Sequence, residues 1–163
     1  MRTLFIVTIL ANIVFAFGSL PWMPEKIAVH FSLDGTPNRF EPPIVTAMMM
    51  SVTVIFTGAI FLGISLLAPI MPPNLWNMPN RDYWLNDENR PQTIRRVCCS
   101  LELMGILTML LFLLLQWEFV RANLIDPPKL SINILHFGLG IYLATITFET
   151  VRLCWSFRLP KES

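Results

Sequence analysis

Long apolar stretches constrain this chain more than any other feature of its sequence. Four of them run for about 18 to 27 residues, enough for a helix to cross a hydrocarbon layer of ~30 Å. They lie at Thr3–Leu20, Ile44–Ile70, Val97–Val120 and Leu130–Trp155. The sequence therefore predicts an all-α membrane protein, a four-transmembrane-helix bundle, in which residues 1–163 form a single domain.

The composition agrees with a membrane location. The 163 residues are 54% hydrophobic and 14% charged, whereas about a quarter of the residues of a soluble domain are charged. The loops are too short to hold a separate soluble catalytic domain. We interpret the first span as a retained helix rather than a cleaved signal peptide, because Pro21-Trp22 follows it without a small-residue cleavage site.

Several function classes find no support in the sequence. The net charge of +1 gives no basic surface for nucleic acid. Cys98, Cys99 and Cys154 lack the spacing of a disulfide framework or a zinc site. We find no GxSxG, HExxH, Walker or strand-linked GxGxxG motif, so neither a catalytic residue nor a cofactor is predicted.

Basic residues are unequally divided between the two sides of the predicted bundle. Eight lie in the N-terminal, middle and C-terminal segments, at Arg2, Arg81, Arg90, Arg95, Arg96, Arg152, Arg158 and Lys161. Four lie in the first and third loops, at Lys26, Arg39, Arg121 and Lys129. The positive-inside rule then predicts that both termini and the middle loop are cytoplasmic.

The first loop, Pro21–Pro43, is expected to face outward as a small ordered extracytoplasmic cap. Its prolines oppose a helix, and Ile27–Phe31 is typical of a short extended segment. Asp34-Gly35 is a strong turn signal because glycine adopts the positive φ that such turns need. These features predict a hairpin-like structure.

The middle loop, Met71–Arg96, is expected to face inward. Tyr83 and Trp84 suit the interfacial level of a bilayer. Asp87 is interpreted as the cap of a short helix that enters the third span, with Pro91 in its first turn.

Charged residues within the spans need partners, because an unpaired charge there costs about 2.5–3.5 kcal/mol. Glu102, Glu149 and Arg152 are such residues, and we group them with His136 as an intramembrane polar cluster. Glu149 and Arg152 are spaced to pair along one helix, and Arg152 reaching Glu102 is the alternative. A structural ion-pair cluster is favoured, and a proton or ion relay is the competing interpretation.

Only two histidines occur, His30 and His136, and both belong to the outer half of the protein. With Asp34 or Glu118 they would form a zinc-like ligand set. The competing expectation is that His30 hydrogen-bonds within its own loop and that His136 bonds to a polar neighbour such as Asn133. Glu118 itself is expected to be solvated near the outer interface.

Two loop segments carry a family resemblance. Leu20–Phe31 reads LPWMPEKIAVHF and is followed by DGTPN at Asp34–Asn38. Asn77–Leu85 reads NMPNRDYWL. The first resembles the outer-loop signature LPxxPExVAxHFxxxGxPdgw of the bacterial membrane family called domain of unknown function 1648, and the second resembles the element NLPNKDYWL of a subset of that family.

The chain departs from the family pattern at three places. Phe40 stands where the family often has tryptophan, Glu41-Pro42 stands where Ser-Lys usually follows, and Asn86–Arg90 replaces APERR. The same domain occurs in a larger membrane protein that gives immunity to a sporulation-delaying peptide toxin and holds a repressor at the membrane. The resemblance implies a bacterial inner-membrane location and a binding or sensing role.

The favoured hypothesis is a non-enzymatic sensor, immunity or accessory protein that binds a peptide or protein partner. The expected binding residues belong to the two motif segments: His30, Asp34, Gly35, Pro37, Asn77, Pro79, Asn80, Tyr83 and Trp84. The alternatives are a small transporter or ion pathway that uses Glu102, Glu149 and Arg152, and a membrane enzyme built on His30 and Asp34. The expected partners are the lipid bilayer and a peptide or protein, with a homo-oligomer left open.

Overall fold

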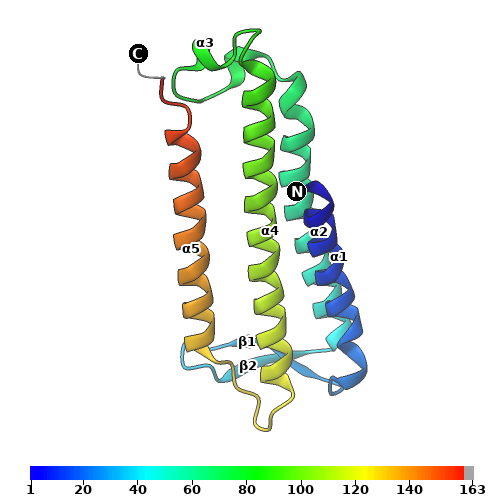
Figure 1. Ribbon diagram of the computed structural model, residues 1–163. Helices are drawn as coiled ribbons and strands as arrows, with labels where there is room; N and C mark the ends of the chain where they lie inside the picture. The colour runs from blue at the N-terminus through cyan, green and yellow to red at the C-terminus, as the bar shows by residue number, and fades with distance from the viewer. Residues whose placement is uncertain (160–163) are drawn as a thin grey trace.

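The computed structural model describes residues 1–159 and contains four helices that are long and apolar enough to cross a membrane. They are α1 (Arg2–Gly18), α2 (Pro43–Leu67), α4 (Arg90–Asn123) and α5 (Ile132–Trp155), as Figure 1 shows. The predicted all-α class with four long apolar helices is thereby confirmed. The third span is longer than predicted, because α4 begins at Arg90 rather than at Val97.

Proline and asparagine set the helix boundaries at the middle loop, Met71–Arg96. The short 3-10 turns Ala68–Ile70 and Pro73–Leu75 follow α2, where Pro69, Pro72 and Pro73 interrupt the helical pattern. Asn89 occupies the N-cap of α4 and Pro91 its first turn, so the prediction of Asp87 as the cap is wrong. Asn86 stabilises this turn instead, because its side-chain oxygen accepts a hydrogen bond of 2.8 Å from the backbone N–H of Asn89.

Helices α1, α2 and α4 enclose the core. Phe5, Val54, Ile106 and Met109 are buried together there. Gly105 allows α1 to approach α4, since a Cβ at this position would lie 2.7 Å from ring atoms of Phe5. Burial of these side chains between three helices fixes their relative positions.

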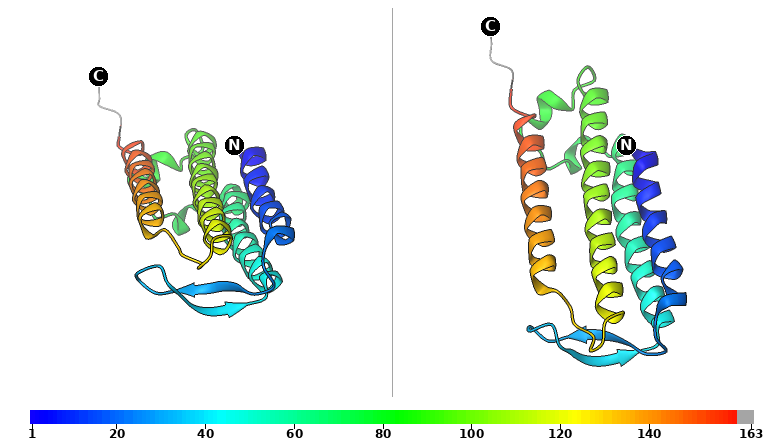
Figure 2. Two further views of the ribbon diagram at one scale, coloured as in Figure 1. Left: turned by 90° about the horizontal axis from the view of Figure 1, so that it is seen from below. Right: turned by 60° about the horizontal axis from the view of Figure 1, so that its bottom comes forward.

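Helix α5 lies against α4, on the side away from α1 (Figures 1 and 2). Only 6% of the apolar window of α5 is buried within the protein, compared with 22% to 33% for the other three helices. Most of the α5 surface is therefore left to lipid or to another molecule. Tyr142 and Glu149 are among its few residues with polar contacts to α4.

A two-stranded antiparallel hairpin closes one end of the bundle (Figure 2). Strand β1 (Ile27–Phe31) pairs with β2 (Pro37–Glu41), and Gly35 in the turn has φ +81°. Oδ1 of Asn123 accepts a hydrogen bond from the backbone N–H of Ala28 at 2.6 Å, and Nδ2 of Asn123 donates to the Ala28 carbonyl at 3.1 Å. Helix α4 therefore holds β1 from its open edge. The predicted ordered cap and its turn are confirmed.

The opposite end carries the middle loop with the short helix α3 (Arg81–Trp84). The start of α1 and the last turn of α5 face this end, whereas the hairpin and the loop before α5 face the other (Figure 1). Lys161, which contributed to the charge count, lies outside the described residues. Which end is cytoplasmic stays a prediction from the positive-inside rule.

Candidate functional site

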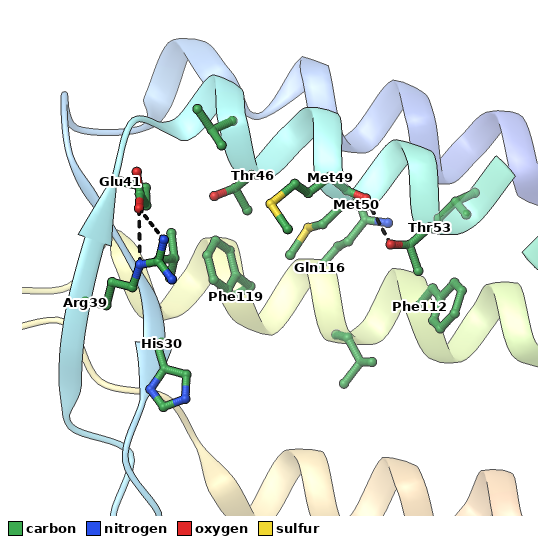
Figure 3. Close-up of a pocket in the computed structure, with 14 residues that line it drawn as sticks. His30, Arg39, Glu41, Thr46, Met49, Met50, Thr53, Phe112, Gln116 and Phe119 are labelled. Atoms are coloured by element: carbon green, nitrogen blue, oxygen red, sulfur yellow. Dashed lines mark hydrogen bonds and ion pairs between the residues drawn. The ribbon is translucent and has the colours of Figure 1, made fainter. Parts of the chain in front are cut away.

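A cavity of about 540 Å³ lies beneath the hairpin, between α2 and α4 (Figure 3). Its polar end is formed by the hairpin residues His30, Arg39 and Glu41. The rest of the wall is mainly apolar or weakly polar and consists of Val29, Val45, Thr46, Met49, Met50, Thr53, Val54, Phe112, Leu115, Gln116 and Phe119. We call this cavity the hairpin groove.

Helical periodicity explains why these residues share one wall. Val45, Met49 and Thr53 are four residues apart on α2, and Phe112 and Phe119 are seven apart on α4, so each set lies on one helix face. The hairpin crosses the ends of these helices and adds its polar side chains at one end of the groove. An apolar cavity with a polar end is the usual form of a site for an amphipathic ligand.

The polar side chains at this end bond to one another and to the hairpin, but some of their hydrogen-bonding atoms remain unpaired. Arg39 donates from Nε and Nη2 to Oε1 of Glu41, at 3.1 and 2.7 Å. Nδ1 of His30 lies 2.6 Å from Oδ1 of Asn38, which confirms that His30 bonds within its own loop. One carboxylate oxygen of Glu41 and one nitrogen of His30 have no partner among residues 1–159.

A buried amide network lies between α1 and α4, and Gln116 is its member in the groove wall. Nε2 of Gln116 donates to Oδ1 of Asn12 at 2.8 Å, and Nδ2 of Asn12 donates to the carbonyl of Met109 at 3.0 Å. Gln116 and Asn12 are 3% and 1% exposed. Buried polar groups of this kind hold helices together in lipid.

Among the predicted outer-loop residues, only His30 lines the groove. Asp34 accepts hydrogen bonds from the backbone N–H and the hydroxyl of Thr36, which hold the pKa of its carboxyl below the usual value. Gly35 forms the turn and its carbonyl accepts a hydrogen bond from the backbone N–H of Leu130, while Pro37 opens β2. These three residues shape the hairpin rather than the groove.

Of the predicted middle-loop residues, two make structural hydrogen bonds and three are exposed. Asn80 and Trp84 both donate side-chain hydrogen bonds to the carbonyl of Phe157, at 2.9 and 2.8 Å. Asn77, Pro79 and Tyr83 are exposed. The middle-loop motif therefore holds the C-terminal end of α5 and leaves part of its surface open.

The intramembrane charges form two separate ion pairs instead of one cluster. Glu102 accepts a hydrogen bond from Arg2 at 3.0 Å and another from Ser65. Glu149 pairs with Arg152 on α5 and accepts a hydrogen bond from Ser100 at 2.7 Å. Arg152 thus pairs within its own helix and not with Glu102.

His136 lies outside both pairs. It is exposed on α5, and no hydrogen bond joins it to Asn133 in the described part of the chain. Within residues 1–159 no three His, Cys, Asp or Glu side chains gather closely enough to hold a metal ion. The zinc-like ligand set of His30 and His136 with Asp34 or Glu118, one of the alternatives from the sequence, is therefore not brought together in the described residues.

The expectation that Glu118 is solvated is wrong. Its side chain is 0% exposed and pairs with Arg121. It also accepts a hydrogen bond of 2.7 Å from the backbone N–H of Ser131, the residue that precedes α5. The loop folds back over α4, so the carboxylate of Glu118 becomes a buried link between α4 and the start of α5.

Sequence reasoning missed most of the hairpin groove. Arg39, Glu41 and the α2 methionines gave no signal as a group, because their proximity depends on how the hairpin crosses the helix ends. Gln116 did offer a signal. It is an isolated amide in a leucine-rich span, and Asn12 is the only amide in the first span.

Comparison with known proteins supports the resemblance seen in the sequence. Residues 6–55 match the family described as domain of unknown function (DUF1648). The matched segment covers most of α1, the hairpin and the half of α2 that borders the groove. No curated protein and no solved structure matches the chain.

Proposed function

We propose that this chain is a non-enzymatic, multi-pass protein of the bacterial inner membrane that binds an amphipathic peptide or a segment of a partner protein. Its role is that of a sensor, immunity or accessory protein. The observation that carries the proposal is the hairpin groove, with its apolar walls on α2 and α4 and its polar end on the hairpin. Nonpolar side chains of the ligand lie along the helices while its polar groups reach His30, Arg39 and Glu41.

The polar end favours a ligand that both donates and accepts hydrogen bonds. The guanidinium of Arg39 is a donor, whereas the free oxygen of Glu41 is an acceptor beside it. A fatty acid or phosphate group would bring a second negative charge toward Glu41. A peptide supplies both kinds of group, and the resemblance to a domain found in a toxin-immunity protein points the same way.

Helix α5 offers a route from the outer cap to the middle loop. Its N-terminal end is held by Glu118 and by the hairpin turn, and its C-terminal end is held by Asn80 and Trp84. A ligand that displaces the hairpin would change the contacts at one end of α5. The arginine-rich middle loop at the other end is the surface that a cytoplasmic partner would contact.

An ion pathway through Glu102, Glu149 and Arg152 has less support. A relay needs its groups to share one route, but Glu102 bonds to α1 and α2 while Glu149 bonds within α5 and to Ser100. Each carboxylate already has its own arginine, as expected of structural ion pairs.

Site-directed photo-cross-linking in intact cells tests the proposed function. A photoreactive residue at Met49, inside the groove, should capture one recurring peptide or protein segment, identified by mass spectrometry. The same residue at Phe56 is the matched control, because Phe56 also lies on α2 and is as exposed as Met49, at 67%, but does not line the groove. Capture at Met49 should fall when Thr53→Phe narrows the groove from an exposed position of its wall.

Two outcomes contradict the proposal. One is equal capture of the same molecules at Met49 and Phe56, which would indicate general contact with the membrane environment. The other is capture of lipid alone at Met49. Ion flux into liposomes that Glu102→Gln abolishes would favour the alternative function instead.

A further inference from the structure

The orientation of the Gln116 side chain is fixed by its neighbour. Nδ2 of Asn12 donates to two backbone carbonyls, of Thr8 at 2.8 Å and of Met109 at 3.0 Å. Both amide hydrogens of Asn12 are used, so its Oδ1 must be an acceptor. Nε2 of Gln116 supplies the donor at 2.8 Å.

The consequence is an acceptor without a donor. With Nε2 directed to Asn12, Oε1 of Gln116 is buried and has no hydrogen-bond partner among the described residues. Reversing the Gln116 amide would place two oxygens against each other. A buried acceptor that receives no hydrogen bond is energetically unfavourable, and natural proteins contain few of them.

Gln116 is also part of the groove wall, about one helical turn from Phe119 and from Phe112 on the same face of α4. Thr46 and Thr53, the other polar groups on this wall, come from α2. Thr53 donates its hydroxyl to the carbonyl of Met49 at 2.9 Å, so that proton is not available to Gln116. Thr46 makes no hydrogen bond to Oε1 of Gln116 either. Gln116 also borders a second cavity of only about 20 Å³, which is too small for a ligand, so a ligand donor must come from the groove.

We infer that Gln116 determines specificity in the hairpin groove by accepting a hydrogen bond from an N–H group of the bound ligand. This inference rests on the proposed function, since it requires the groove to be a binding site. It adds a chemical requirement to that function. Two ligands with the same apolar chain are distinguished by whether they present an N–H at the level of Gln116.

Two matched probes isolate the donor. N-methyltetradecanamide and N,N-dimethyltetradecanamide share a chain and a carbonyl, but only the first has an N–H. Each competes with a photoreactive N-alkyl tetradecanamide for labelling of Met49 and Met50 in full-length protein in lipid nanodiscs. We expect the N–H probe to compete better by about twofold to tenfold, the range of one net neutral hydrogen bond.

The Gln116→Met variant should label equally well but lose this preference, because methionine fills a similar volume without an acceptor. Dividing the competition strength of each probe in the wild-type protein by its competition strength in the variant removes differences in how the probes partition into lipid. If the variant does not fold, competition for labelling around Phe56, outside the groove, gives the same correction for partitioning, so the inference remains testable in the wild-type protein.

The two proposals fail in different ways. Equal competition by both probes in the wild-type protein, with Met49 and Met50 still labelled, overturns the role of Gln116. It leaves the proposed binding of a peptide untouched, because the cross-linking at Met49 in cells tests that separately. That result would mean that a water satisfies Oε1. Labelling of Met49 no stronger than labelling around Phe56 would overturn the groove itself.

Discussion

The carboxylate of Glu118 accepts a hydrogen bond from the backbone N–H of Ser131, 2.7 Å away, and so joins α4 to the first residue before α5. Its negative charge lies at the N-terminal end of α5, where the helix dipole favours an anion. Arg121 neutralises the same carboxylate from one turn further along α4. This arrangement makes the two partners unequal, because Glu118 is fully buried while Arg121 is 35% exposed.

We predict that Arg121→Met destabilises the protein more than Glu118→Gln does. The first change leaves a buried carboxylate without its cation, at a cost of about 3 kcal/mol or more. The second leaves an arginine that can turn toward water, at a cost of about 1–2 kcal/mol. Thermal unfolding in mild detergent measures both, and the double variant should be more stable than Arg121→Met. Equal stability of Arg121→Met and the wild type would contradict this assignment.

We predict that Gly35→Ala disorders the hairpin turn. Gly35 has φ +81°, and an added Cβ would lie within van der Waals overlap of the carbonyl oxygen of Leu130. Positive φ alone costs a residue with a side chain about 1–2 kcal/mol. Gly140→Ala is the matched control, since a Cβ there meets nothing within 4 Å. Hydrogen exchange of residues 27–41 should rise only in the Gly35 variant.

The middle loop should release the end of α5 when Trp84→Phe removes the indole N–H that bonds to Phe157. Arg96 stacks 5.4 Å from the Trp84 ring, so this variant keeps an aromatic surface and removes mainly the hydrogen bond. We expect faster backbone hydrogen exchange over residues 153–159. Tyr83→Phe, which removes an exposed hydroxyl, should not have this effect. The same exchange rates in both variants would show that the hydrogen bond does not hold α5.

The hairpin turn should loosen in acid because ionised Asp34 accepts two hydrogen bonds from Thr36. Its pKa is lowered from 3.8 in the folded protein, so this contribution is complete above that value and is lost as the pH falls through the folded pKa. NMR signals of Gly35 and Thr36 should shift only at such low pH. Asp34→Asn should remove this pH dependence, and an unchanged titration in that variant would assign it to another group.

The parts of the structure that follow from local sequence were predictable. The spans follow from length and hydropathy, and the turn follows from Asp34-Gly35. The hairpin groove was not predictable, because it needs α2, α4 and the hairpin to be placed together. Asn12 and Gln116 are 104 residues apart in the chain, and no local pattern pairs them.

The charged residues of the spans likewise show that contacts between distant segments could not be predicted from local sequence. The sequence correctly indicated that Glu102, Glu149 and Arg152 need partners, and helical spacing correctly paired Glu149 with Arg152. It could not assign Arg2 to Glu102, which depends on α1 packing beside α4. The burial of Glu118 was not predictable either, because Ser131, which contacts its carboxylate, belongs to the following loop.

The proposed function requires the hairpin to face outward and the middle loop to face the cytoplasm. Single cysteines at Leu33, which is 99% exposed at the hairpin turn, and at Leu75, which is 65% exposed in the middle loop, report this directly in a variant without the three native cysteines. In intact cells a membrane-impermeant maleimide should label Leu33→Cys, and should label Leu75→Cys only after the membrane is permeabilised. Labelling of Leu75→Cys but not Leu33→Cys in intact cells would contradict the account.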